Sequence, residues 1–119
     1  MPVKLNVDRL RRIRAGAPAA VDRGVARGAE YIRDLATQLA PEDEGDLKST
    51  VRVEGQEGSG QRTVRAGGVS GPNKFVDYAE HVEYGTADSP AQPFMTPAAK
   101  AINVAKEVRA ELRKLVRGR

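Results

Sequence analysis

The fold is decided by the stretch "LNVDRLRRIRAGAPAAVDRGVARGAEYIRDLATQLA", residues 5–40. Its apolar residues recur in steps of three and four, the spacing that places side chains on one face of an α-helix. They are Leu10, Ile13, Ala17, Val21, Val25, Ala29, Ile32, Leu35 or Ala36, and Leu39. Gly16 and Pro18 interrupt the pattern, because glycine is a poor helix former and proline fits best in a first helical turn. The spacing therefore predicts a short helix over 5–14, a break, and a longer helix over 17–39.

A second helical pattern closes the chain over residues 96–119. Thr96 can cap this helix and Pro97 suits its first turn. Its apolar stripe consists of Ala101, Ala105, Val108, Leu112, and Leu115 or Val116. Basic residues collect in the last turns, which suits the negative end of the helix dipole. The chain is thus expected to have a helix at each end.

The region between these helices carries shorter patterns. The stretches "STVRVEG" (49–55) and "RTVRAGG" (62–68) alternate in polarity, which predicts two strands. The polar connection "GQEGSGQ" (55–61) joins them, so we expect a hairpin with a long, flexible loop. "GGVSGPNK" (67–74) is predicted to be a loop. "KFVDYAEHVEYGT" (74–86) favours a short helix, although its alternation also suits a strand.

Length and composition limit what this chain can be. With 119 residues, 39% hydrophobic and 4% aromatic, we expect one domain with a thin core of small aliphatic side chains. Oligomerisation is a common supplement for so lean a core. The chain has no cysteine, which excludes disulfides, thiolate nucleophiles and cysteine-bound metals. No segment resembles a secretion signal or approaches the roughly 18 apolar residues of a membrane span, so we expect no membrane partner.

The residues that usually carry catalysis are sparse. His81 is the only histidine, so no histidine pair can hold a metal, and no nucleophile-elbow motif supports a serine triad. Four acidic residues fall within 42–46, but they lack the spacing and the closing glutamate of an EF-hand. We therefore expect no catalytic residue, cofactor or metal, and a protein that is not an enzyme.

The net charge of +4 is unevenly distributed. Residues 1–33 and 98–119 each carry a net charge of +5, whereas residues 34–97 carry −6. Such asymmetry favours contact with nucleic acid or with the oppositely charged part of another copy. The candidate residues for either contact are Arg11, Arg12, Arg14, Arg23 and Arg27. Aromatic residues that could stack on bases are nearly absent, and no base-reading motif occurs.

Three separated segments resemble one protein family. "APEDEGDLKSTV" (40–51) resembles the "A-P-x-D-T-G-x-L-x-x-S-I" turn of the head–tail joining, or tail-completion, proteins of long-tailed phages. "YAEHVEYGT" (78–86) is similar to that family's "Y-A-x-x-V-E-F-G-T", and "PAQPFMTPA" (90–98) to its "P-A-x-P-F-L-x-P-A". Order and spacing also fit, over nearly the whole chain. Glu44 stands where threonine is usual, and Tyr84 replaces a common phenylalanine.

The resemblance implies a single α+β domain over residues 1–119. A long N-terminal helix and a C-terminal helix would pack on a small antiparallel sheet; the break predicted near Gly16–Pro18 departs from the family, because it makes the first helix less continuous than is typical. It also implies a structural virion protein of the neck, related to the lambda minor tail protein Z group. Such a protein completes the tail or joins it to the DNA-filled head, as a hexameric ring. Its partners would be its own copies, other neck and tail proteins and, without sequence specificity, packaged DNA. Its location would be the head–tail junction, after assembly in the host cytoplasm.

Two other functions fit parts of this pattern. A tail terminator, which caps the tail tube, has a similar size and position in the virion. From another class, a small basic protein that binds DNA without sequence specificity would explain the charge but not the three segments.

The stretch "EYGTADSPAQPFMTP" (83–97) supplies the candidate contact between subunits. Glycine permits backbone conformations closed to other residues, and its three prolines lower the entropy lost on ordering. The candidate interface residues are Tyr84, Gly85, Thr86, Phe94 and Met95. The alternative for Phe94 is a place in the core, where it packs the last helix onto the sheet. For the arginines, the choice lies between a DNA-filled ring lumen and the acidic middle of a neighbouring subunit.

Overall fold

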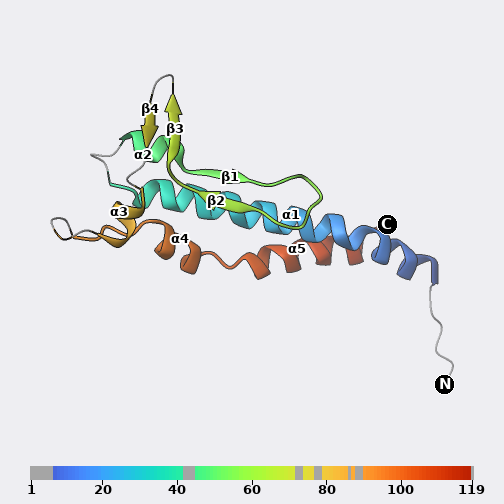
Figure 1. The fold of residues 1–119 in the computed structure, drawn as a ribbon. Helices are drawn as coiled ribbons and strands as arrows, with labels where there is room; N and C mark the ends of the chain where they lie inside the picture. Colours follow the sequence, from blue (N-terminus) through green and yellow to red (C-terminus); the bar gives the residue numbers. More distant parts are fainter. Residues whose placement is uncertain are drawn as a thin grey trace.

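The computed structural model of the chain describes residues 7–41, 45–71, 74–76, 79–85, 87 and 90–118. The helices are α1 (Val7–Leu39), α2 (Gly45–Thr50), α3 (Ala79–Tyr84), α4 (Met95–Ala101) and α5 (Val104–Arg117). The strands are β1 (Arg52–Glu54), β2 (Thr63–Arg65), β3 (Gly68–Gly71) and β4 (Lys74–Val76). The predicted α+β class, with a long N-terminal helix, a C-terminal helix and a small antiparallel sheet, is confirmed (Figure 1).

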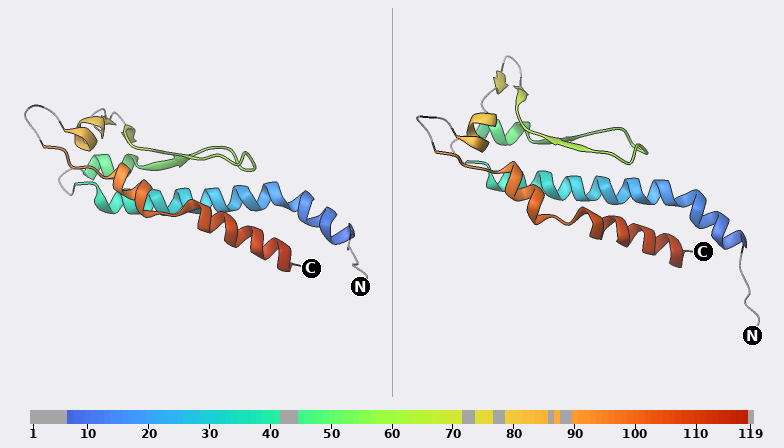
Figure 2. Two further views of the ribbon diagram at one scale, coloured as in Figure 1. Left: turned by 90° about the horizontal axis from the view of Figure 1, so that it is seen from below. Right: turned by 60° about the horizontal axis from the view of Figure 1, so that its bottom comes forward.

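Helix α1 is the spine of an elongated molecule that measures 72 × 30 × 18 Å. Its 33 residues span about 50 Å at 1.5 Å per residue. The β1–β2 hairpin lies along one side of α1, and α4 and α5 lie along another, as the two views of Figure 2 agree. Helix α5 makes its most extensive contact with α1 and runs antiparallel to it. The C-terminal helix α5 therefore packs mainly against α1.

The predicted break near Gly16–Pro18 is wrong, because α1 continues through both residues. Pro18 removes the N–H that would bond to the carbonyl of Arg14, which normally weakens a helix. Helix α5 packs against α1 at Gly16, two residues before this proline. A Cβ on Gly16 would lie 2.8 Å from Cδ1 of Leu115, so Gly16 permits close contact between the helices.

A stripe of small residues forms the seam between α1 and α5. It consists of Gly16, Ala20, Gly24 and Gly28, spaced four residues apart. A Cβ on Gly24 would lie 2.4 Å from the Cα of Val108, and a Cβ on Gly28 would lie 2.8 Å from Cγ2 of Val104. Glycine is thus needed because the two backbones approach so closely. The sequence pattern suggested glycine as a helix breaker, whereas here it is a packing residue.

The predicted C-terminal helix is divided into α4 and α5. Ile102 is extended, with φ −98° and ψ 125°, and so interrupts the helical hydrogen bonding. Asn103 then caps α5, because its Oδ1 accepts a hydrogen bond of 3.1 Å from the N–H of Lys106. Asparagine is among the residues favoured at this position, so the sequence contained the signal for a second helix start.

The first hairpin agrees with the prediction. Strands β1 and β2 are antiparallel, and Val53 lies opposite Val64. The prediction of a loop over 67–74 is wrong, because β3 and β4 form a second antiparallel hairpin there. The positive φ angles of Gly67 and Gly68 give the chain the turn that leads from β2 into β3. The short helix expected within 74–86 is α3, preceded by β4.

The core is small, as composition predicted. It consists of Ala36, Ala40, Leu47, Val51, Phe94 and Ala98. Half of these residues are alanines, so each larger side chain contributes a large share of the buried apolar area. The core lies where α1, α2 and α4 meet, at the end of α1 remote from its N-terminus.

Candidate subunit-contact surface

The three segments that carry the family resemblance meet in this core. Residues 40–51 supply Ala40, Leu47 and Val51, and residues 90–98 supply Phe94 and Ala98. From residues 78–86, the partly buried Ala79 and Val82 pack against the same cluster. Segments far apart in the sequence thus form one structural unit.

Glu83 links the second of these segments to the third. Its carboxylate accepts hydrogen bonds from the backbone N–H groups of Phe94 (2.7 Å), Met95 (2.9 Å) and Thr96 (2.7 Å). Glu83 is only 6% exposed. The expectation that Thr96 caps the last helix is wrong, because α4 already begins at Met95 and Glu83 satisfies its first N–H groups. Pro97, which has no N–H to satisfy, lies in the first turn as predicted.

The hydrogen bonds keep this carboxylate ionised. Burial alone would raise the pKa of Glu83, but hydrogen bonds from the Thr96 side chain and from three backbone N–H groups more than offset it. The pKa of Glu83 is therefore lowered. A buried charge held by this many donors fixes the geometry between α3 and α4. The segment between them is further tied by a 2.8 Å hydrogen bond from the N–H of Gln92 to the carbonyl of Val82.

An open hollow of about 490 Å³ lies beside this junction. Tyr84, Phe94 and Met95 line it, together with residues of β2 and of the turn into β3. Tyr84 is 73% exposed, and Gly85 follows it with a φ of 78° that favours glycine. Thr86 lies outside the described residues. The structure therefore places four of the five candidate interface residues in one neighbourhood.

Phe94 differs from the other described candidates because its side chain is fully buried. It is 0% exposed and belongs to the core, so the expectation that it contacts a neighbouring subunit is wrong. The alternative, a core role, is confirmed. Phe94 borders the hollow but is fully buried, whereas Tyr84 and the half-buried Met95 remain accessible. The accessible part of the candidate surface is thus Tyr84, Gly85 and Met95.

Arginines and a glutamate form the polar rim of the hollow. Arg52 and Arg65 each make a 2.9 Å ion pair with Glu54. Glu80 is exposed on the first turn of α3. A hollow with a polar rim and accessible Tyr and Met side chains is suited to receive part of another protein.

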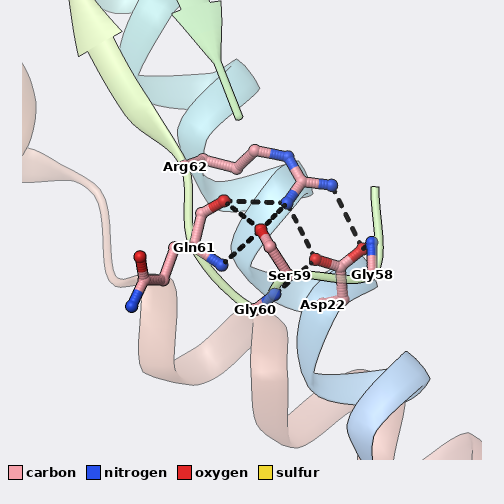
Figure 3. Close-up of polar contacts among 6 residues, drawn as sticks. All are labelled: Asp22, Gly58, Ser59, Gly60, Gln61 and Arg62. Atoms are coloured by element: carbon pink, nitrogen blue, oxygen red, sulfur yellow. Dashed lines mark hydrogen bonds and ion pairs between the residues drawn. The ribbon is translucent and has the colours of Figure 1, made fainter. Parts of the chain in front are cut away.

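A second polar site joins the β1–β2 hairpin to α1 (Figure 3). Asp22 of α1 is 4% exposed and accepts hydrogen bonds from the backbone N–H groups of Gly58 (2.9 Å) and Gly60 (2.8 Å). The Arg62 guanidinium donates to both carboxylate oxygens of Asp22, at 2.8 and 3.1 Å. The loop over 55–61, predicted to be flexible, is therefore anchored.

The contact between Asp22 and Arg62 shifts the pKa of both side chains. Hydrogen bonds from Arg62, and then those from Gly58 and Gly60, hold the pKa of Asp22 well below its ordinary value. The same contact raises the pKa of Arg62. Asp22 is spaced three and seven residues before Val25 and Ala29 of the apolar stripe, and this spacing was the sequence signal for a buried carboxylate. Asp22 was not among the site residues predicted from the sequence.

Glu111 is the third buried carboxylate, and it lies in the seam between α1 and α5. It pairs with Arg23 (3.2 Å), Arg27 (2.9 Å) and Lys114 (3.3 Å). The hydrogen bond from Arg23 is the main reason why the pKa of Glu111 is lowered. Helical spacing places Glu111 on the same face as Val108 and Leu115, although Glu111 was not predicted from the sequence as a site residue.

The five candidate arginines for a DNA or subunit contact therefore divide into two groups. Arg23 and Arg27 hold Glu111, and Nη2 of Arg12 donates a 2.7 Å hydrogen bond to the carbonyl of Gly118. These three join α1 to α5, although Arg12 and Arg23 remain largely exposed. Arg11 and Arg14 are exposed, and no residue in the described ranges pairs with either.

Metal and membrane sites find no support in the described part of the chain. There, no three His, Cys, Asp or Glu residues come together in a way that could hold a metal ion. Every helix in these ranges is too short or too polar to cross a bilayer.

Comparison of the chain with protein families, curated proteins and solved structures found no match.

Proposed function

We propose that this chain is a structural protein of the neck of a long-tailed phage. It completes the tail or joins it to the DNA-filled head, as a hexameric ring of its own copies that also contacts other neck and tail proteins. Its role is architectural and not catalytic. Its place is the head–tail junction of the virion, reached after assembly in the host cytoplasm.

One observation carries this proposal: the three resembling segments pack on one another. Glu83 of the second segment binds three backbone N–H groups of the third, and Leu47 of the first shares a core with Phe94 of the third. Contacts among the three segments are what a single family pattern requires, and they support reading the segments as one unit.

The hollow beside Tyr84 is the subunit contact in this proposal. Tyrosine is enriched at protein interfaces because it offers a large rigid surface with one polar end. A ring contact joins two different surfaces of the same chain, so the hollow would receive another part of a neighbouring copy. The acidic middle and basic ends of the chain would give that contact its electrostatic complementarity.

Electron microscopy of particles produced without this gene tests the proposal. Free DNA-filled heads beside unattached tails are the expected result. Tails of irregular length would instead favour the tail terminator. Normally joined particles would contradict a neck role and leave the small DNA-binding protein as the remaining alternative.

A further inference from the structure

The outward face of α5 carries a row of basic side chains, which we call the α5 stripe. It consists of Lys106, Arg109, Arg113 and Arg117, spaced three, four and four residues apart, and all four are exposed. At 100° per residue, this row lies opposite the face that packs on α1, where Val104, Val108 and Leu115 are found. The helix therefore separates its apolar side chains from its cations.

The α5 stripe carries no negative charge because the two acidic residues of α5, Glu107 and Glu111, lie on other faces of the helix. Glu111 lies in the seam, where Arg23 and Arg27 of α1 and Lys114 satisfy it. Glu107 is half-buried and lies on the side toward α1. In the described ranges, no carboxylate pairs with a side chain of the α5 stripe. Four cations thus face solvent without compensation.

We propose that the α5 stripe binds the phosphates of double-stranded nucleic acid without reading base sequence. The inference rests on the charge arrangement alone and is independent of the proposed function. From Lys106 to Arg117 the row is about 16 Å long, at 1.5 Å per residue, and it is straight because it lies on one helix. Duplex DNA presents a negative charge about every 1.7 Å of its axis, so a straight row of cations meets several phosphates. Three of the four residues are arginines, which bind phosphate with two parallel hydrogen bonds.

Other partners fit this face less well. A helix that lies on a membrane buries an apolar face in the lipid, but α5 uses its apolar face against α1. The half-exposed Val116 is the large apolar side chain that α5 leaves beside the stripe. A protein partner usually requires buried aromatic or aliphatic anchors, which the stripe lacks. Single-stranded nucleic acid requires aromatic stacking, and α5 has no aromatic residue.

Fluorescence anisotropy with a short labelled DNA duplex tests the proposal. The intact chain should bind two unrelated sequences equally, and the logarithm of its association constant should fall with the logarithm of salt concentration with a slope of about −3 to −4. The double variant Arg109→Gln/Arg113→Gln should bind about tenfold more weakly at about 50 mM salt, with a slope smaller by about 2. Both positions are exposed, so circular dichroism should show an unchanged fold. Lys106→Gln/Arg117→Gln provides a second pair with the same expected result.

The comparison variant is Arg11→Gln/Arg14→Gln, which removes the same charge from exposed, unpaired arginines of α1 that were candidates for a DNA contact from the sequence, so it sets that surface against the α5 stripe. Arg14 lines a hollow under the hairpin tip, away from α5, so this variant should keep most of the affinity. Equal losses in both double variants would mean that net charge alone drives binding, and would overturn the proposal. Absence of duplex binding at about 50 mM salt would overturn it as well. Binding to anionic lipid vesicles but not to DNA would assign the stripe to a membrane surface instead.

Discussion

At the scale of single residues, Glu83 shows how one side chain can organise the start of a distant helix. Glu83→Gln keeps the shape of the side chain but removes its charge and one acceptor oxygen, so buried N–H groups of α4 lose part of their hydrogen bonding. We expect the free energy of unfolding to fall by about 1–3 kcal/mol, measured by urea denaturation. The exposed Glu80 of the same helix supplies the control, because Glu80→Gln should change stability by less than about 0.5 kcal/mol. Equal stability of the two variants would contradict the role given to Glu83.

Substitution of Asp22 should have a local effect, because Asp22 anchors a loop and not the start of a helix. In Asp22→Asn, the side-chain amide is uncharged and has one acceptor oxygen in place of two. It therefore cannot reproduce the charged contact with Arg62 or accept hydrogen bonds at both side-chain positions. We expect the N–H groups of Gly58 and Gly60 to exchange with deuterium faster, while those in the middle of α1 keep their protection. Hydrogen exchange followed by mass spectrometry measures this difference. Asp34→Asn is the control, since Asp34 is exposed on the same helix and pairs at the surface with Arg33; unchanged exchange at Gly58 and Gly60 would show that the anchor is dispensable.

The sequence contains a signal for part of these sites, although neither was predicted from it. Helical spacing places Asp22 and Glu111 on the apolar faces of their helices, which could have identified both as buried carboxylates. Their partners could not be found this way, because Arg62 lies 40 residues from Asp22 and Arg23 lies 88 residues from Glu111. Local periodicity reports which face is buried but not what lies against it.

At the scale of elements, the α1–α5 seam depends on the absence of side chains. Alanine favours helix over glycine by about 1 kcal/mol, so Gly24→Ala would stabilise an isolated helix. In this protein the added Cβ would collide with the Val108 backbone, and we expect a net loss of about 1–3 kcal/mol. Gly16→Ala is the matched control, because its Cβ meets only the flexible tip of Leu115. The melting temperature should be clearly higher for Gly16→Ala than for Gly24→Ala. The opposite order would contradict close backbone packing at Gly24.

The elements themselves were predictable to different degrees. The terminal helices and the β1–β2 hairpin follow from periodicity, because each has a regular apolar face. The β3–β4 hairpin has no such periodic face in its sequence, and it is recognised in the structure by its antiparallel backbone pairing. Gly16, expected from the local pattern to break the helix, lies within a continuous α1 and packs against Leu115 of α5, which lies far along the chain. Prediction from local pattern therefore missed a contact made with a distant segment.

At the scale of the whole molecule, the buried carboxylates predict a stability that depends on acid pH. The pKa values of Asp22, Glu83 and Glu111 are all lowered in the folded chain. The unfolded chain, with ordinary carboxyl pKa values of about 4, therefore binds more protons in acid. The contribution of these groups is fully present above about pH 5 and is lost as the pH falls through their folded pKa values. The urea midpoint should fall steeply below about pH 4 and less steeply in Glu83→Gln; a midpoint constant down to about pH 3 would contradict this.

Assembly is the last property of the whole molecule, and Tyr84 and Phe94 separate it from folding. Phe94→Ala removes the largest buried side chain of a small core, so it should cost about 3–5 kcal/mol and reduce assembly only through unfolding. Tyr84→Ala removes an exposed side chain at the hollow and should leave the urea midpoint within about 0.5 kcal/mol of the parent chain.

If the hollow is the subunit contact, the folded Tyr84→Ala chain should nevertheless fail to form rings in sedimentation velocity. It should also fail to restore joined particles in phage that lack the gene. Because Tyr84 contributes little to folding but much to the accessible surface, its substitution isolates the contact in a way that Phe94 cannot. A Tyr84→Ala chain that assembles and joins particles like the parent would place the subunit contact on another face of the molecule.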